Sequence, residues 1–248
     1  MKMKQEQHTL TGEQLKDPTE LFQRLYWIFK ETLYPAMTYE KFVKFYTGSK
    51  PHYMQITFLT EAGEDIGFFT CAYSHMQLMD RRSTVCRVAI GILKEHHGGK
   101  MPFGALCRRI ISYKFRHPFT PVYMVAYLAN PLVYATIAKY TAEHWPARNK
   151  ATPQVICDLK ENILRESKMQ NIEVRDFVLK IHFPVSLSEA LIKRIFGSKN
   201  PDVKFYLERN PEFTKQMGLM TIVPVRWFNV FANIHKAMVA RPLKKTGM

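Results

Sequence analysis

The sequence has no uninterrupted run of 18 apolar residues, so we expect no membrane-spanning helix. Residues 1–12 are polar and show no apolar leader segment. The cysteines are widely spaced and none belongs to a Cys-x-x-Cys pair: Cys71, Cys86, Cys107 and Cys157. This spacing argues against a disulfide framework and favours free thiols in a reducing compartment. We therefore expect an intracellular, cytoplasmic protein.

Several signature motifs are also missing. The sequence has no Gly-x-Ser-x-Gly elbow, no zinc-ligand spacing, and no helix-turn-helix, zinc-finger or aromatic RNA-binding signature. A Walker A loop is excluded because Lys94 and Met101 stand where that motif needs Gly and Ser/Thr. We therefore expect neither a covalent nucleophile, nor a bound metal, nor a specific nucleic-acid module.

Acidic residues are scarce. The 248 residues include 36 Lys or Arg against 21 Asp or Glu, which gives a formal charge of +15. The excess is concentrated in residues 81–119, where nine basic residues face one acid, Glu95, and in residues 226–248, which have five basic residues and no acid. Such segments attract anions: the phosphates of a cofactor, nucleic acid or an anionic membrane. A solvated basic surface is the plainer interpretation.

The apolar periodicity predicts an α/β (α+β) protein with a mixed, mostly antiparallel central sheet flanked by helices. Hydrophobic residues make up 46% of the chain, enough for a large core. In residues 1–150 we expect helices at 19–33, 38–46, 102–114 and from 131, and strands at 52–59, 66–76, 83–93 and 122–128.

Residues 151–248 are predicted to form an extension that completes the sheet and the substrate cleft. We expect helices at 152–166 and 186–196 and a strand at 176–183. Two short apolar runs, 204–207 and 218–225, could pair as strands. The pattern of residues 226–240 predicts a basic amphipathic helix. This helix could dock on the domain, lie on an anionic membrane, or bind the groove of a partner.

A glycine-containing loop precedes the helix predicted at 102–114. It consists of His97, Gly98, Gly99 and Lys100, and Gly104 follows in the first helical turn. A helix N-terminus offers unpaired N–H groups and the positive end of its dipole, and glycines let a phosphate approach the backbone. The loop is therefore a candidate pyrophosphate site, although an ordinary glycine-containing connection explains it equally well.

The helix after residue 130 has good start signals. Asn130 suits the N-cap position and Pro131 the first turn. A well-capped helix is a sufficient explanation of this pair when it is considered alone.

The order of these elements resembles the GNAT acyltransferase superfamily over residues 19–145. In that family two helices precede a three-strand meander, and Ile66-Gly67-Phe68-Phe69 is similar to the opening of its second strand. The strand at 85–93, with its glycine loop and helix, resembles the acyl-CoA-binding motif, whose usual form is Gln/Arg-x-x-Gly-x-Gly/Ala. The resemblance implies acetyl-CoA, or another acyl-CoA, as cofactor.

The same resemblance implies roles for particular residues. Backbone amides between Gly98 and Gly104 would bind the pyrophosphate of CoA, and the strand around Ile90 and Ile92 would pair with its pantetheine arm. Asn130 would contact the cofactor. A helix tyrosine often protonates the leaving thiolate in this family, and both Tyr134 and Tyr140 are candidates. No carboxylate lies within residues 83–93, so Glu95 and His75 are the nearby candidates for a general base, beside a water relay or no base at all.

The sequence therefore supports two hypotheses. The first is an N-acyltransferase that transfers an acetyl group from acetyl-CoA to an unknown amine, a small molecule or a protein. The second is a non-catalytic module on the same scaffold that binds nucleic acid or an anionic membrane through its basic segments.

Overall fold

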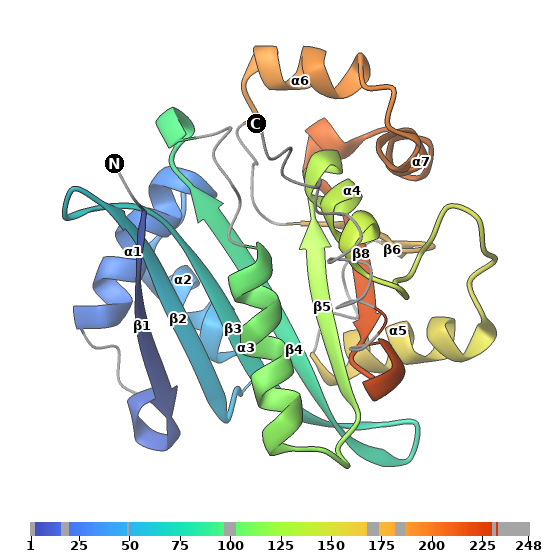
Figure 1. The fold of residues 1–248 in the computed structure, drawn as a ribbon, viewed down its shortest axis with the longest axis horizontal. Coiled ribbons are helices and arrows are strands. Elements are labelled where there is room, and N and C mark those ends of the chain that lie inside the picture. Colours follow the sequence, from blue (N-terminus) through green and yellow to red (C-terminus); the bar gives the residue numbers. More distant parts are fainter. Residues whose placement is uncertain are drawn as a thin grey trace, which may run out of the picture.

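The computed structural model describes residues 3–15, 20–48, 50–96, 103–167, 174–181, 187–229 and 232. Within these residues one eight-stranded sheet has the strand order β1-β2-β3-β4-β5-β8-β7-β6 (Figure 1). Its strands are β1 (Lys4–Thr11), β2 (Tyr53–Glu61), β3 (Glu64–Leu78), β4 (Arg81–Ile92), β5 (Val122–Leu128), β6 (Val174–Arg175), β7 (Val178–Lys180) and β8 (Met217–Pro224). All neighbours are antiparallel except β4 and β5, so the predicted mixed, mostly antiparallel sheet is confirmed.

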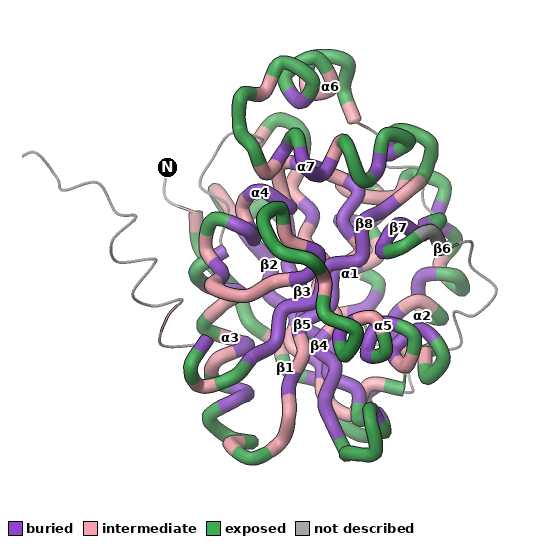
Figure 2. Tube along the Cα trace, turned by 90° about the vertical axis from the view of Figure 1, so that its right-hand side faces the viewer, coloured by how far each residue is buried: buried purple, intermediate pink, exposed green. Residues whose placement is uncertain are grey.

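The helices cover both faces of this sheet. They are α1 (Glu20–Thr32), α2 (Tyr39–Thr47), α3 (Phe103–Arg116), α4 (Pro131–Tyr140), α5 (Gln154–Glu166), α6 (Glu189–Phe196) and α7 (Pro201–Arg209). Figure 2 shows α3 and α4 on one side of the sheet and α2 and α5 on the other. Shorter 3₁₀ turns are η1 (Gly12–Leu15), η2 (Lys94–His96) and η3 (Phe213–Lys215).

Local signals in the sequence account for most element boundaries. The Thr38 side chain accepts a hydrogen bond from Lys41 N and caps α2, and Asn130 accepts from Leu132 N and caps α4. The strand–α3–strand unit returns the chain to β5 parallel to β4, as a crossover helix allows. The helices and strands from α1 to α4 are thus found where the periodicity predicted them.

Two expectations for residues 151–248 are wrong. The run 204–207 lies inside helix α7, because Asn200 caps a helix that starts at Pro201 and because Val203 and Tyr206 are buried on one helical face. Instead of a strand over 176–183, the structure has a β6–β7 hairpin with Asp176 at its turn, at φ 58°; residues 182–186 lie outside the described residues.

Strand β1 has no counterpart in the sequence predictions. It pairs with β2 along its whole length, yet Leu10 is its one buried residue. An edge strand with both faces largely polar lacks the alternating pattern by which strands are recognised. The predicted tail helix at 226–240 lies mostly outside the described residues.

The sheet packs against two apolar clusters, of which the larger extends onto both faces (Figure 2). One includes buried residues of α1 and α2 together with the β2 and β3 side chains beneath them. The other includes buried residues of α3, α4, α5 and α7. Side chains of β4 alternate between the two: Ala89 packs against the first cluster, whereas Val88 and Ile90 pack against the second.

Candidate functional site

The pairing between β4 and β5 stops halfway along both strands. Their parallel ladder extends from Thr84 and Val122 to Arg87 and Val125. On the outer sides the ladders continue, since β3 pairs with β4 as far as Ile92 and β8 pairs with β5 as far as Leu128. Figure 1 shows β4 and β5 diverging toward their C-terminal ends. We call the space between these diverging ends the β4/β5 gap.

Backbone hydrogen bonds fix which amides of β4 face this gap. Thr84 N donates to Pro121 O, just before β5, whereas Leu93 N donates to Ile66 O on β3. Backbone N–H groups alternate in direction along a strand, so the even-numbered residues of β4 face β5. Ile90 and Ile92, both predicted to bind the cofactor, therefore direct their N–H groups toward the gap.

Exposure rises where the ladder ends. On β4 the residues from Ser83 to Cys86 are buried, and those from Arg87 to Ile90 are each half-buried. A central strand that becomes accessible partway along its length indicates an opening within the sheet. Within the described residues no strand fills the gap, so it is a candidate place for a ligand to reach strand backbone as an added strand does.

The first turn of α3 belongs to the same end of the structure. The chain leaves β4 at this end, and α3 then runs back toward the start of β5 (Figure 1). Gly104 is exposed, and among the described residues a Cβ there would meet one side chain within 4 Å, the Arg108 guanidinium at 4.0 Å. The first turn has no acidic residue. Open space, helix N–H groups and a nearby cation together suit an anion.

Two predicted site residues have structural partners. The Asn130 side-chain oxygen accepts from Leu132 N at 2.9 Å, so it caps α4. The Tyr134 hydroxyl is buried and donates to the Pro146 carbonyl at 2.9 Å. Burial also raises the pKa of Tyr134.

Tyr140 lies in a different environment. It ends α4, it is half-buried, and its ring lies 5.6 Å from that of Phe103, the first described residue of α3. The Lys139 Nζ lies 5.2 Å from the centre of the Tyr140 ring. The structure thus brings Tyr140 to the N-terminus of α3, whereas Tyr134 packs beside α7, where its ring lies 5.8 Å from that of Phe205.

The candidate bases are separated from each other. Glu95 is exposed in η2, directly after β4 and therefore at the open end of the gap. His75 is paired in register with Thr84, at the closed end of the β4/β5 pair. The loop residues His97, Gly98, Gly99 and Lys100 lie outside the described residues.

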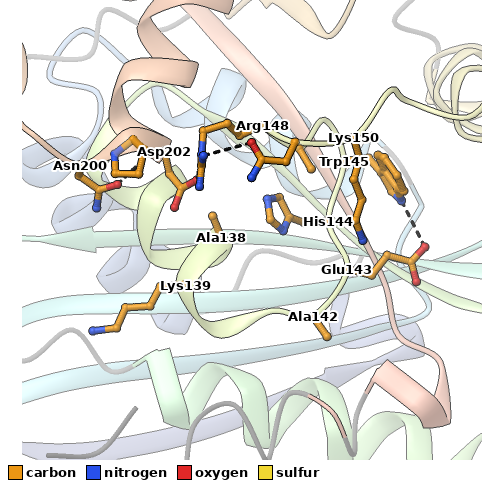
Figure 3. Close-up of a pocket in the computed structure, with 13 residues that line it drawn as sticks. Ala138, Lys139, Ala142, Glu143, His144, Trp145, Arg148, Lys150, Asn200 and Asp202 are labelled. Carbon is orange, nitrogen blue, oxygen red and sulfur yellow. Dashed lines mark hydrogen bonds and ion pairs between the residues drawn. The ribbon is translucent and has the colours of Figure 1, made fainter. Parts of the chain in front are cut away.

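A hollow of about 620 Å³ lies beside α4 (Figure 3), and no residue of β4 or β5 lines it. The end of α4, the segment around Arg148 and the start of α7 line it. Arg148 is paired with Asp202 at 3.2 Å, and Glu143 accepts hydrogen bonds from Trp145 and Asn229. Arg148 and Asp202 thus neutralise each other, whereas the Glu143 carboxylate is bonded to two neutral groups.

The start of the tail docks on the domain. The Trp227 ring lies 4.8 Å from that of Phe115, and Lys114 Nζ lies 5.6 Å from its centre. Among the helices that the structure describes, none combines the length and apolar character needed to cross a bilayer. The described residues also contain no group of three or more His, Cys, Asp or Glu side chains that could hold a metal ion.

Arg87 is a candidate site residue that sequence analysis missed. It is the last β4 residue paired with β5, and its side chain contacts α2, where Nη2 donates to the Phe45 carbonyl at 3.0 Å. In the sequence it was one of nine basic residues in a long segment. Its position inside the sheet depends on strand order, which no local signal reveals.

The element order and the diverging parallel pair confirm the GNAT-like fold class that the sequence predicted. No protein-family model and no curated protein matches the chain.

A comparison with solved structures finds partial matches, each at low sequence identity and with a TM-score below 0.5. A predicted acetyltransferase from Clostridium acetobutylicum, crystallised with acetyl-CoA, is 12% identical with a TM-score of 0.39, and the match covers 60% of this chain and 95% of that one. An acetyltransferase from Thermus thermophilus is 12% identical with a TM-score of 0.37, covering 89% and 97%. A probable N-acyltransferase from Enterococcus faecalis is 12% identical with a TM-score of 0.36; the match covers 56% of this chain and spans about a third, 32%, of that protein.

Proposed function

We propose that this protein is an acyl-CoA-dependent N-acyltransferase that transfers an acetyl group from acetyl-CoA to an amine. The observation that carries the proposal is the β4/β5 gap, where the inner ladder ends at Arg87 while both outer ladders continue. An extended amide-containing chain can hydrogen-bond to β4 in that opening as an additional strand does.

The residues at the open end fit the two halves of such a ligand. Ile92 directs its N–H into the gap and can pair with the amide-containing pantetheine arm. The first turn of α3 carries no acid, and the exposed Gly104 leaves space above the helix N–H groups for a diphosphate. Arg108 adds positive charge on the same helix face.

When bound, acetyl-CoA supplies the acetyl group as a thioester. The protein must hold an amine against the thioester carbonyl, because orientation contributes much of the barrier reduction in such transfers. Ile90 N–H is placed to stabilise negative charge that develops on a carbonyl oxygen in the gap. The C–N bond forms, the C–S bond breaks, and the amine loses a proton to water or to Glu95.

The departing sulfur needs a proton, and we assign this role to Tyr140. It lies at the N-terminus of α3, beside Phe103. The Tyr134 hydroxyl is already donated to the Pro146 carbonyl inside the fold, so Tyr140 is the better candidate.

Acetyl-CoA titration followed by thermal shift tests the proposal. A ligand that binds the native state raises the melting temperature by mass action. At a free ligand concentration of 100 times Kd, the free energy of unfolding increases by about 2.7 kcal/mol. Gly104→Glu should abolish this shift, since it places a carboxylate in the diphosphate site. The same variant should leave the unliganded protein folded, because a carboxylate is favourable at a helix N-terminus and the position is open.

Gly104→Ala is the matched control, since it adds a Cβ without charge and should retain acetyl-CoA binding. The proposal fails if acetyl-CoA does not stabilise the wild-type protein, or if Gly104→Glu binds it as well as Gly104→Ala does. Retention on heparin or anionic vesicles that is unaffected by acetyl-CoA and lost steeply with salt would instead support the non-catalytic module.

A further inference from the structure

Arg87 occupies the point where the β4/β5 ladder ends. Its side chain lies on the α2 face of the sheet, where the centre of the Phe45 ring is 5.5 Å from the guanidinium carbon. Ala89, two residues farther along, packs on the same face. By contrast Ile90 packs against the cluster that includes α3. Arg87 therefore borders the gap from the face opposite α3.

The guanidinium of Arg87 has few hydrogen-bond acceptors and no counter-ion among the described residues. Within the described residues its side-chain hydrogen bond is the one from Nη2 to the Phe45 carbonyl, and its Nε is buried without a partner. No described carboxylate forms an ion pair with it; the titratable groups that act on it are the hydroxyls of Tyr46 and Tyr127. Burial lowers the pKa of Arg87, as expected for a cation removed from water without a counter-ion.

Other cations in this chain are held differently. Arg24 binds Asp65 through Nε and Nη2, both at 2.7 Å, and it also binds Glu6. Lys114 Nζ donates to the carbonyls of Pro118 and Thr120, both at 2.8 Å. Arg24 and Lys114 are thus each surrounded by acceptors, and Arg87 differs from both.

A small hollow adjoins the Arg87 side chain. It has room for about one water-sized group, about 10 Å³, and is lined by Phe45, Tyr46, Thr70, Ala72, Arg87, Val88 and Ala89. Its remaining walls are apolar or aromatic apart from Thr70, whose hydroxyl lies 3.3 Å from that of Tyr46. A single carboxylate oxygen fits this space, and the guanidinium fork is the side chain best suited to bind it.

We propose that Arg87 binds the carboxylate of the acyl acceptor, so that the substrate class is an amine that also carries a carboxylate group. This proposal rests on the proposed acyltransferase function. The two substrates then approach the gap from opposite faces, the diphosphate-bearing donor from the α3 face and the carboxylate-bearing acceptor from the α2 face. The acceptor carboxylate supplies the counter-ion that Arg87 lacks, and its amine is held next to β4.

The test compares wild-type protein with Arg87→Met and Arg87→Lys. Free thiol release from acetyl-CoA is measured with L-amino acids and with the amines that lack only their α-carboxylate, such as L-leucine against 3-methylbutylamine. Wild-type kcat/KM should be at least tenfold higher for the carboxylate-bearing member of a pair. Arg87→Met should remove that preference, Arg87→Lys should keep part of it, and the Kd for acetyl-CoA should be unchanged in both.

A stability measurement separates substrate binding from a structural role. Replacing a desolvated, unpaired cation with an apolar side chain of similar length should leave the melting temperature of unliganded Arg87→Met unchanged or raise it. A lower melting temperature, with equal losses toward both members of each pair, would instead make Arg87 a structural support and overturn the proposal.

The outcomes distinguish the two proposals. Suppose that acetyl-CoA binds but that no carboxylate-bearing amine has a higher kcat/KM than the amine lacking the carboxylate, because neither reacts or both react equally. The Arg87 proposal is then wrong and the acyltransferase proposal stands. If acetyl-CoA does not bind, the acyltransferase proposal fails first, and the Arg87 proposal falls with it.

Discussion

We expect a pair of stacked histidines to make the stability of this fold sensitive to mild acid. The rings of His52 and His75 lie 3.6 Å apart with an interplanar angle of 9°, at the closed end of the β4/β5 pair. His52 Nε2 and the Tyr113 hydroxyl form a hydrogen bond of 3.0 Å, and His52 Nδ1 is buried without a partner. Burial, reinforced by the charges of His75, His117 and Arg82, lowers the pKa of His52 to about 4.

The sign of the effect follows from proton uptake. In the unfolded chain His52 titrates near its ordinary pKa of 6.5, whereas in the native state it stays neutral to about 4. The stabilisation is therefore complete above pH 6.5 and is lost as the pH falls from 6.5 to 4. The difference between these two pKa values corresponds to at most about 3 kcal/mol. Because the ring is half-exposed, we expect about 1 to 2 kcal/mol.

Urea unfolding of wild type and His52→Gln at pH 7.5, 6.0, 5.0 and 4.5 measures this contribution. Gln can retain the bond to the Tyr113 hydroxyl but does not titrate, so the variant should lose about 1 to 2 kcal/mol less unfolding free energy over this range. The Glu6 carboxyl does not interfere, since Arg24 lowers its pKa to about 2 and its contribution is lost below pH 4.5. Parallel losses in both proteins would refute the reasoning.

Two further predictions concern packing and catalysis. Gly91→Ala should lower the unfolding free energy by about 1–3 kcal/mol, because the new Cβ would lie 2.1 Å from Thr32 Oγ1. In denaturant titration, adding Thr32→Ala to Gly91→Ala should recover part of the loss, and no recovery would contradict a direct clash. Tyr140→Phe should lower kcat for acetyl transfer without weakening acetyl-CoA binding, whereas Tyr134→Phe should mainly cost about 1 kcal/mol of stability through the lost bond to the Pro146 carbonyl. Steady-state kinetics and calorimetry distinguish the two variants. A loss of kcat in Tyr134→Phe but not in Tyr140→Phe would make Tyr134 the acid.

Much of the candidate site could be located from sequence because its signals are local. Asn130 and Pro131 mark the start of α4, and the alternating residues of β4 mark that strand. The even-numbered positions Ile90 and Ile92 were predicted to bind the cofactor, and the structure turns their amides toward the gap. Whether they bind it stays a prediction.

The sequence by itself determined where the chain from α1 to α4 forms helices and strands, since caps and apolar periods act within a few residues. The tertiary structure alone decided that β8, some ninety residues after β5, pairs beside it, that β4 and β5 part after Arg87, and that Arg87 has no carboxylate partner among the described residues. The physical reason is that strand pairing and counter-ion contacts join residues far apart in the chain. The local sequence pattern around a residue does not identify the distant residue that it will contact.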